Sequence, residues 1–113
     1  MKYYYGVEIL RVVDGDTVDV RMDLGFDVWH KCRVRLVGIN SPESRTRDKE
    51  EKKRGIAAKE WLIDRLADES VELHSQGKGK YGRVLGELYI DGTNINQEMV
   101  EVGHAVVYDG GKR

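Results

Sequence analysis

The chain has 113 residues, 40% of them hydrophobic, and its 19 Lys and Arg residues nearly balance its 20 Asp and Glu residues, for a formal net charge of −1. This length allows one modest core, so we expect a single domain over residues 1–113. A near-neutral chain argues against a broad basic surface, so nucleic-acid binding would depend on a local cluster of cations or a bound metal. Cys32 is the only cysteine, which excludes an internal disulfide and a paired-cysteine zinc site.

The sequence contains no hydrophobic run of the signal-peptide type and no stretch long enough to span a membrane. We therefore expect no membrane partner and, as the default, a cytoplasmic location.

The first third of the chain predicts three strands, at residues 7–13, 18–24 and 28–39. The middle strand has the clearest pattern, because apolar and charged residues alternate from Val18 to Leu24, as in a half-buried strand. An Asp-Gly-Asp turn at residues 14–16 precedes this strand, and residues 24–27 are typical of a hairpin connection to the next one.

A long charged segment follows Pro42. Residues 43–54 carry both charge signs and no apolar side chain, which predicts a surface loop. Ala58, Leu62 and Leu66 then recur at helical spacing, so we predict an amphipathic helix over residues 55–68.

The second half of the chain predicts strands at residues 71–74 and 83–90, separated by a basic loop at 76–80. A second helix follows, with Thr93 or Asn94 as its N-cap and Gly103 as its terminator. Residues 105–108 are predicted to be extended. This order favours a mainly β fold, a five-stranded Greek-key barrel of the OB type with two helices. An antiparallel sheet with one packed helix is the alternative.

Two polar segments near the predicted strand ends could carry chemistry. In the first, Asp16 starts a strand after a glycine turn and offers a hard oxygen ligand to calcium or magnesium, although an ordinary satisfied turn has the same pattern. In the second, the Arg35 guanidinium could bind phosphate through two hydrogen bonds. It precedes an oxygen-rich turn with the Asn40 amide, the Ser41 carbonyl and the Glu43 carboxylate, and a solvated strand and turn is the alternative.

The third segment places Lys80, Tyr81 and Arg83 around a glycine. Two cations and an aromatic ring suit a phosphate and a sugar or base, but basic loops of this kind are also ordinary surface features.

As an ordered set, these segments resemble the thermonuclease family, typified by staphylococcal nuclease, over nearly the whole chain. The set runs DGDT at residues 14–17, RLVGINSPE at 35–43, a helix after a glycine, KYGR at 80–83, and a strand followed by DG at 91–92. The resemblance implies a five-stranded OB barrel and calcium-dependent cleavage of DNA and RNA at the P–O5′ bond, which leaves 3′-phosphate ends. Magnesium or manganese could replace calcium.

The resemblance also assigns roles to single residues. Asp16, Asn40 and Ser41 correspond to the metal-binding positions, with Ser41 contributing its backbone carbonyl. Arg35 and Arg83 correspond to the two arginines that bind the phosphate.

Four further positions complete the set of candidates. Glu43 corresponds to the glutamate proposed to position or activate water. Lys80 and Tyr81 match residues that contact a neighbouring phosphate, and Tyr108 lies near the position of the base-stacking tyrosine.

Two departures from the family pattern stand out. Asn40 replaces a carboxylate by a neutral amide, which should weaken metal binding. The long C-terminal helix of the typical member is missing from this sequence, so an uncovered apolar patch could make the chain a monomer or a weak homo-oligomer.

We expect a metal-dependent endonuclease acting on DNA or RNA. The alternative is a non-catalytic OB module that binds nucleic acid or protein, but the presence of Asp16, Arg35, Glu43 and Arg83 favours the enzyme.

Overall fold

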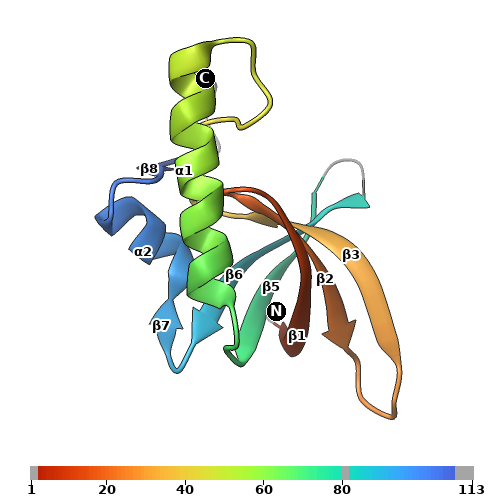
Figure 1. Cartoon of the computed structure of the whole chain (residues 1–113). Helices are drawn as coiled ribbons and strands as arrows, with labels where there is room; N and C mark the ends of the chain where they lie inside the picture. The colour runs from red at the N-terminus through yellow and green to blue at the C-terminus, as the bar shows by residue number, and fades with distance from the viewer. Residues whose placement is uncertain (1–2, 80–81, 109–113) are drawn as a thin grey trace.

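A closed barrel forms the body of the molecule in the computed structural model, which describes residues 3–79 and 82–108 (Figure 1). The main strands are β1 (Tyr3–Asp14), β2 (Thr17–Asp23), β3 (Trp29–Leu36), β5 (Val71–Lys78) and β6 (Val84–Ile90). The helices are α1 (Lys49–Leu66) and α2 (Ile95–Glu101). The short strands are β4 (Ile39–Asn40), β7 (Thr93–Asn94) and β8 (Val106–Val107).

The sheet closes into a barrel because β3, at one edge, also pairs with β6. Its order is β3-β2-β1-β5-β6-β7, and β3 runs parallel to β6 with Val34 opposite Val84 and Leu36 opposite Gly86. All other neighbours in this sheet are antiparallel. The predicted five-stranded OB-type barrel with two helices is therefore confirmed.

The core follows from the alternation of each strand. Val18, Val20 and Met22 of β2 face inward, as the sequence pattern predicts. Ala58 and Leu62 of α1 are fully buried, so the apolar stripe of this helix packs on the barrel. Neither helix in the described part of the chain is long and apolar enough to cross a membrane.

The first helix is longer than the sequence pattern indicates. It begins at Lys49, with Asp48 as the N-cap whose side chain accepts hydrogen bonds from the backbone N–H groups of Glu50 and Glu51. The prediction of a loop over residues 49–54 is therefore wrong. Residues 49–54 are all charged, so no apolar stripe marks this first part of the helix, which begins at the Asp48 cap.

Two further boundaries depend on tertiary pairing. Strand β5 continues to Lys78 rather than ending at residue 74, because its polar end pairs with Leu85 and Val84 of β6. The second helix is capped by Asn94, whose side chain accepts from the N–H of Gln97, so of the two predicted N-caps Asn94 is the one used. Gly103 has a φ of +87°, which ends this helix as predicted.

Candidate active site

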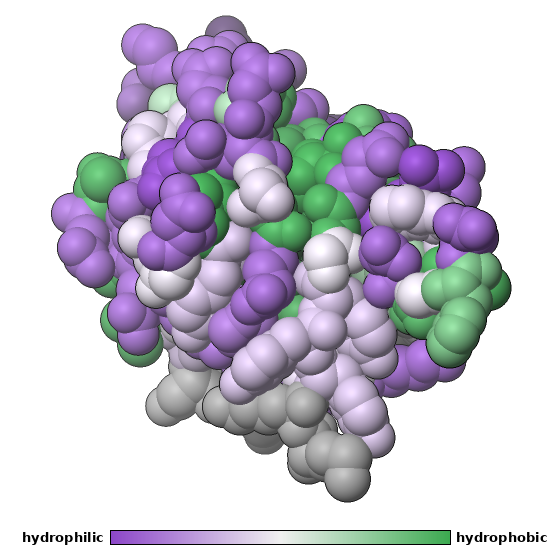
Figure 2. Space-filling model, turned by 90° about the horizontal axis from the view of Figure 1, so that it is seen from below, coloured by the Kyte–Doolittle hydropathy of each residue, from purple (hydrophilic) through white to green (hydrophobic). Residues whose placement is uncertain are grey.

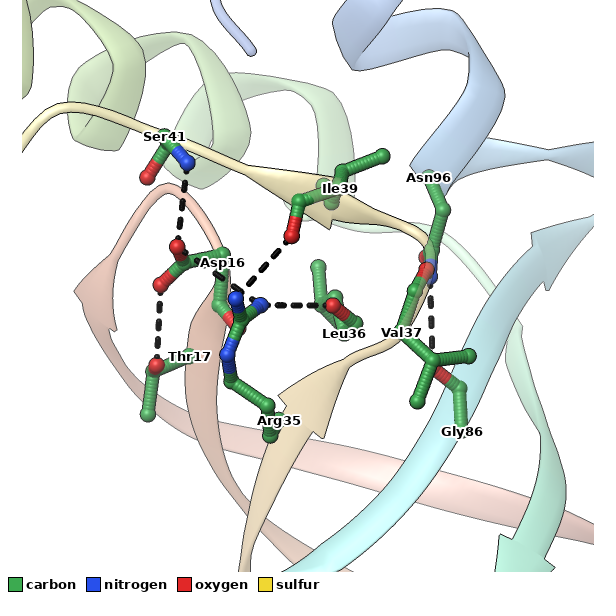
Figure 3. A network of polar contacts seen from close by, with 9 residues as sticks. All are labelled: Asp16, Thr17, Arg35, Leu36, Val37, Ile39, Ser41, Gly86 and Asn96. Atoms are coloured by element: carbon green, nitrogen blue, oxygen red, sulfur yellow. Dashed lines mark hydrogen bonds and ion pairs between the residues drawn. The ribbon is translucent and has the colours of Figure 1, made fainter. Parts of the chain in front are cut away.

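The carboxylate of Asp16 lies in the turn between β1 and β2, with the residue only 9% exposed. Its Oδ1 accepts a hydrogen bond from the Thr17 hydroxyl at 3.0 Å, and its Oδ2 accepts one from the Ser41 backbone N–H at 3.0 Å (Figure 3). The turn approaches residue 41 closely because Gly15 has no side chain, and a Cβ there would lie 2.9 Å from the Ser41 hydroxyl oxygen. The carboxylate is thus held at a defined position.

The guanidinium of Arg35 is fixed beside that carboxylate. Its Nη1 donates to the Leu36 carbonyl at 2.6 Å and lies 3.6 Å from Asp16 Oδ2, while its Nη2 donates to the Ile39 carbonyl at 3.0 Å (Figure 3). The chain turns back after β3 at Gly38, which has a φ of +80°, and this turn presents both carbonyls to the guanidinium. No hydrogen bond joins Nε of Arg35 to the described residues, so this donor could meet a phosphate.

Asn96 of α2 supports the same turn from the interior of the protein. Its amide nitrogen donates to the Val37 and Gly86 carbonyls, and its oxygen accepts from the N–H of Leu88. Asn96 is 2% exposed, so it ties the end of β3 to β6 within the core. Asn96 was not among the sequence candidates, although a polar residue between the buried Ile95 and Met99 was a detectable signal.

Asn40 and Ser41 follow directly after this turn. Asn40 is half-buried in β4, where it pairs with Val106 of β8. Ser41 is 5% exposed, and its hydroxyl oxygen is buried without a hydrogen-bond partner in the described part of the chain. The Ser41 N–H donates to Asp16 Oδ2, so Ser41 directly contacts the turn between β1 and β2.

These residues fit a hard cation, although as a site of low charge. Each oxygen of Asp16 accepts one hydrogen bond and has a second lone pair available for a ligand. Asn40 and Ser41 carry a neutral amide oxygen and a backbone carbonyl oxygen, which are of the kind that calcium accepts. The unpartnered Ser41 hydroxyl adds a polar atom beside them. Among residues 3–79 and 82–108, no three His, Cys, Asp or Glu side chains gather into a metal site.

Glu43 and Arg83 lie in two further segments, after β4 and before β6. Glu43 is exposed, and its backbone N–H donates to Oε2 of Glu51 at 3.2 Å. Arg83 is half-buried just before β6, where its carbonyl accepts from the Gly79 N–H at 2.7 Å. Because Leu85 is paired with Arg35 and β-strand side chains alternate, the backbone places Arg83 and Arg35 on the same face of the barrel wall.

A groove of 480 Å³ adjoins the Arg35 side chain. Its lining consists of Arg35, Leu36, Val37, Gly38, Gln76, Leu85, Glu87 and Tyr108. Tyr108 is held there because its N–H donates to the Gly38 carbonyl at 2.9 Å. The structure therefore brings Tyr108 and Arg35 to one groove, whereas Lys80 and Tyr81 lie outside the described residues.

A larger groove, of 880 Å³, lies elsewhere, between β1 and the second half of α1. Figure 2 shows apolar surface gathered in a hollow on the face of the molecule that is seen from below. None of the described candidate residues lines this larger groove. Of the two grooves, the smaller one is the one lined by Arg35 and Tyr108.

Comparison with known proteins shows the family of the chain. The profile of the family described as staphylococcal nuclease homologue matches residues 33–113, which is more than half of the chain. The chain belongs to the staphylococcal nuclease family. The matched region contains Arg35, Asn40, Glu43 and Arg83, while Asp16 lies before it.

Several relatives of this staphylococcal nuclease family member are named as nucleases. The chain is 34% identical over 102 residues to an uncharacterized endonuclease of Escherichia coli, covering 89% of the chain and 60% of that protein. It is 33% identical over 110 residues to a micrococcal nuclease of Shigella flexneri, covering 89% of the chain and 57% of that protein. The chain thus spans about 60% of the length of the first of these relatives.

Proposed function

We propose that this chain is a calcium-dependent nuclease that hydrolyses phosphodiester bonds of DNA or RNA and leaves 3′-phosphate ends. The observation that carries the proposal is the Arg35 guanidinium, fixed 3.6 Å from the Asp16 carboxylate at the edge of a nucleotide-sized groove. The cleavage position and the preference for calcium over magnesium or manganese rest on the family resemblance.

Charge neutralisation is the main catalytic contribution that we assign to the arginines. A phosphodiester is anionic, and the charge on its oxygens grows as the fifth bond to phosphorus forms. Arg35 is held by two backbone carbonyls, so little reorganisation is needed to present its guanidinium to those oxygens. Arg83, on the same face of the wall, supplies the second positive charge.

Calcium, held by Asp16, Asn40 and Ser41, would supply a further positive charge at the phosphate when bound. Glu43 is two residues beyond Ser41 and its side chain is exposed, so its carboxylate can orient a water molecule and accept its proton. The oxygen of that water attacks phosphorus while the P–O5′ bond breaks, and the leaving 5′ oxygen takes up a proton from solvent water, which gives a 3′-phosphate and a 5′-hydroxyl end.

Substrate binding involves the groove next to Arg35. Leu36 and Leu85 give it apolar surface and Tyr108 an aromatic ring, which together suit a nucleoside attached to the bound phosphate. From the resemblance, we assign a neighbouring phosphate to Lys80 and Tyr81.

The direct test is incubation of the purified chain with single-stranded DNA and with RNA, in calcium and in EDTA. We expect cleavage in calcium only, with products that extend in a polymerase reaction only after a phosphatase removes the 3′-phosphate. Binding without cleavage in any divalent metal would instead support the non-catalytic OB module.

A further inference from the structure

The backbone at Glu43 is anchored to β1. Oδ1 of Asp14, at the end of that strand, accepts hydrogen bonds from both the N–H and the hydroxyl of Ser44, the first at 3.2 Å. Ser44 is 8% exposed although it lies in a polar segment. Two hydrogen bonds to one carboxylate oxygen fix the residue that follows Glu43.

The same segment lies directly on helix α1 at Gly55. A Cβ at position 55 would come within 2.3 Å of the Glu43 carbonyl oxygen and 2.6 Å of the Ser44 nitrogen. Glycine inside a helix is less favourable than alanine, so Gly55 weakens the helix locally. Its presence is explained by the close approach of the Glu43 backbone, which no other residue permits.

Glu51 provides a third anchor, because its Oε2 accepts the Glu43 N–H at 3.2 Å. The backbone of residues 43 and 44 is therefore held by β1 on one side and by α1 on the other. The Glu43 side chain extends from this fixed backbone into solvent.

We propose that Asp14, Ser44 and Gly55 are positioning residues for Glu43. This inference rests on the proposed nuclease function, in which Glu43 orients and deprotonates water. A misplacement of about 1 Å in a reacting group can cost about 10²-fold in rate. Asp14 acts as a hydrogen-bond acceptor for Ser44, so its negative charge is not required. The rival view is that Asp14, two residues from Asp16, contributes charge to the metal site.

The comparison of Asp14→Ala with Asp14→Asn separates these two views. The amide of Asn keeps an Oδ1 acceptor for Ser44 but has no charge. We expect Asp14→Ala to lower kcat about 10- to 100-fold with KM and the calcium requirement unchanged, and Asp14→Asn to restore most of kcat. Ser44→Ala keeps the hydrogen bond from the backbone N–H and loses the one from the hydroxyl, so its kcat should lie between those of the two Asp14 variants. Equal losses for Asp14→Asn and Asp14→Ala, with a higher calcium requirement, would overturn the proposal.

A double variant tests whether Asp14 acts through Glu43. In a Glu43→Gln background, adding Asp14→Ala should lower kcat no further, because the group that Asp14 positions is already inactive. Multiplicative losses would show that Asp14 acts independently of Glu43. Arg65→Ala is the structural control. It removes ion pairs to Glu69 and Glu98 away from the site, so it should lower the melting temperature and leave kcat unchanged.

Hydrogen exchange gives a readout that does not depend on activity. The Ser44 amide should exchange at least 10-fold faster in Asp14→Ala than in the wild type, and Asp14→Asn should retain the protection. The amide of Leu88, in β6, should be unaffected. If the wild type cleaves no nucleic acid, the proposed function fails, but this exchange pattern would still support the anchoring contact. Identical Ser44 exchange in all three proteins would refute it.

Discussion

Nη1 of Arg35 lies 3.6 Å from Oδ2 of Asp16, although 19 positions separate the two residues in the chain. The same guanidinium donates to the carbonyls of Leu36 and Ile39, so it is held by its own turn as well as by the carboxylate. An arginine held in this way can neutralise growing charge without first being reorganised, because its orientation is fixed before substrate binds.

Arg35→Ala should lower kcat about 10²- to 10³-fold with saturating metal, the loss typical of removing one fixed donor to a transition-state oxygen. Steady-state cleavage of single-stranded DNA measures it. Arg33→Ala is the matched control, because Arg33 lies two residues earlier in β3 and pairs with Asp19 instead, so kcat should be unchanged.

Lysine at position 35 or at position 83 should not restore activity, because an ammonium group cannot replace the planar fork of the guanidinium. Arg83→Ala should behave like Arg35→Ala. Near wild-type turnover in either alanine variant would remove that arginine from the mechanism.

Asn40→Asp should lower the calcium concentration that gives half-maximal activity. The substitution adds a full negative charge at a position where the native amide offers a neutral oxygen, and calcium affinity rises with ligand charge. Calcium titrations of activity, and calorimetry without substrate, measure the effect. Turnover can fall at the same time, since a second carboxylate also repels the phosphate.

Asp16→Asn is the opposite change and should raise the calcium requirement sharply or abolish activity. If Asn40→Asp leaves calcium affinity unchanged, Asn40 is not a metal ligand.

Tyr108→Ala should raise KM about 5- to 100-fold, because base stacking on an aromatic ring contributes about 1–3 kcal/mol per base. The effect on kcat should be smaller, since Tyr108 lines the groove next to Arg35 and Asp16 is not part of that lining. Tyr108→Phe keeps the ring and should retain the wild-type KM. An unchanged KM in the alanine variant would place the base elsewhere.

Asn96→Ala should lower the free energy of unfolding by about 2–5 kcal/mol, because it removes a hydrogen-bond partner from three backbone groups, of which the Gly86 carbonyl keeps a second one, the Val37 N–H. These groups are the N–H of Leu88 and the carbonyls of Val37 and Gly86. Urea denaturation measures the loss. The control is Gln97→Ala at the exposed neighbouring position, which should change stability by less than about 0.5 kcal/mol.

The Asp19–Arg33 pair should make a small, acid-sensitive contribution to stability. Hydrogen bonding to Arg33 lowers the pKa of Asp19 below its ordinary value of 3.8. The folded-state pKa is depressed, so the contribution is present above that ordinary value and is lost as the pH falls through the folded pKa.

Asp19→Asn should therefore lower the free energy of unfolding at pH 6 by about 0.2–1 kcal/mol, because the pair is largely solvent-exposed, and by less below pH ~3. Urea denaturation at both pH values measures the difference. In an Arg33→Ala background the substitution should have almost no effect at either pH. An equal loss of unfolding free energy in Asp19→Asn at both pH values would show that the Asp19–Arg33 pair is not the source of the acid sensitivity.

Elements with a local pattern could be predicted from the amino-acid sequence. The alternation in β2 marks its buried face, and the Ala58–Leu62–Leu66 stripe marks the buried face of α1. The sequence also places the N-cap of α2 at Thr93 or Asn94, and the structure selects Asn94. The start of α1 could not be read in this way. Its first six residues are charged, so only the hydrogen bonds of the Asp48 cap distinguish them from a loop.

The assembly of the candidate site depends instead on contacts between distant segments of the chain. Asp16 meets Arg35 because β2 and β3 pair with Thr17 opposite Arg35, and Tyr108 reaches the groove because β8 pairs with β4, with Val107 opposite Ile39. The contacts of Ser44 with Asp14 and of Asn96 with Val37 join residues 30 and 59 positions apart. No local pattern encodes such contacts, because a polar side chain's partner is set by which strands and helices the closed barrel brings together.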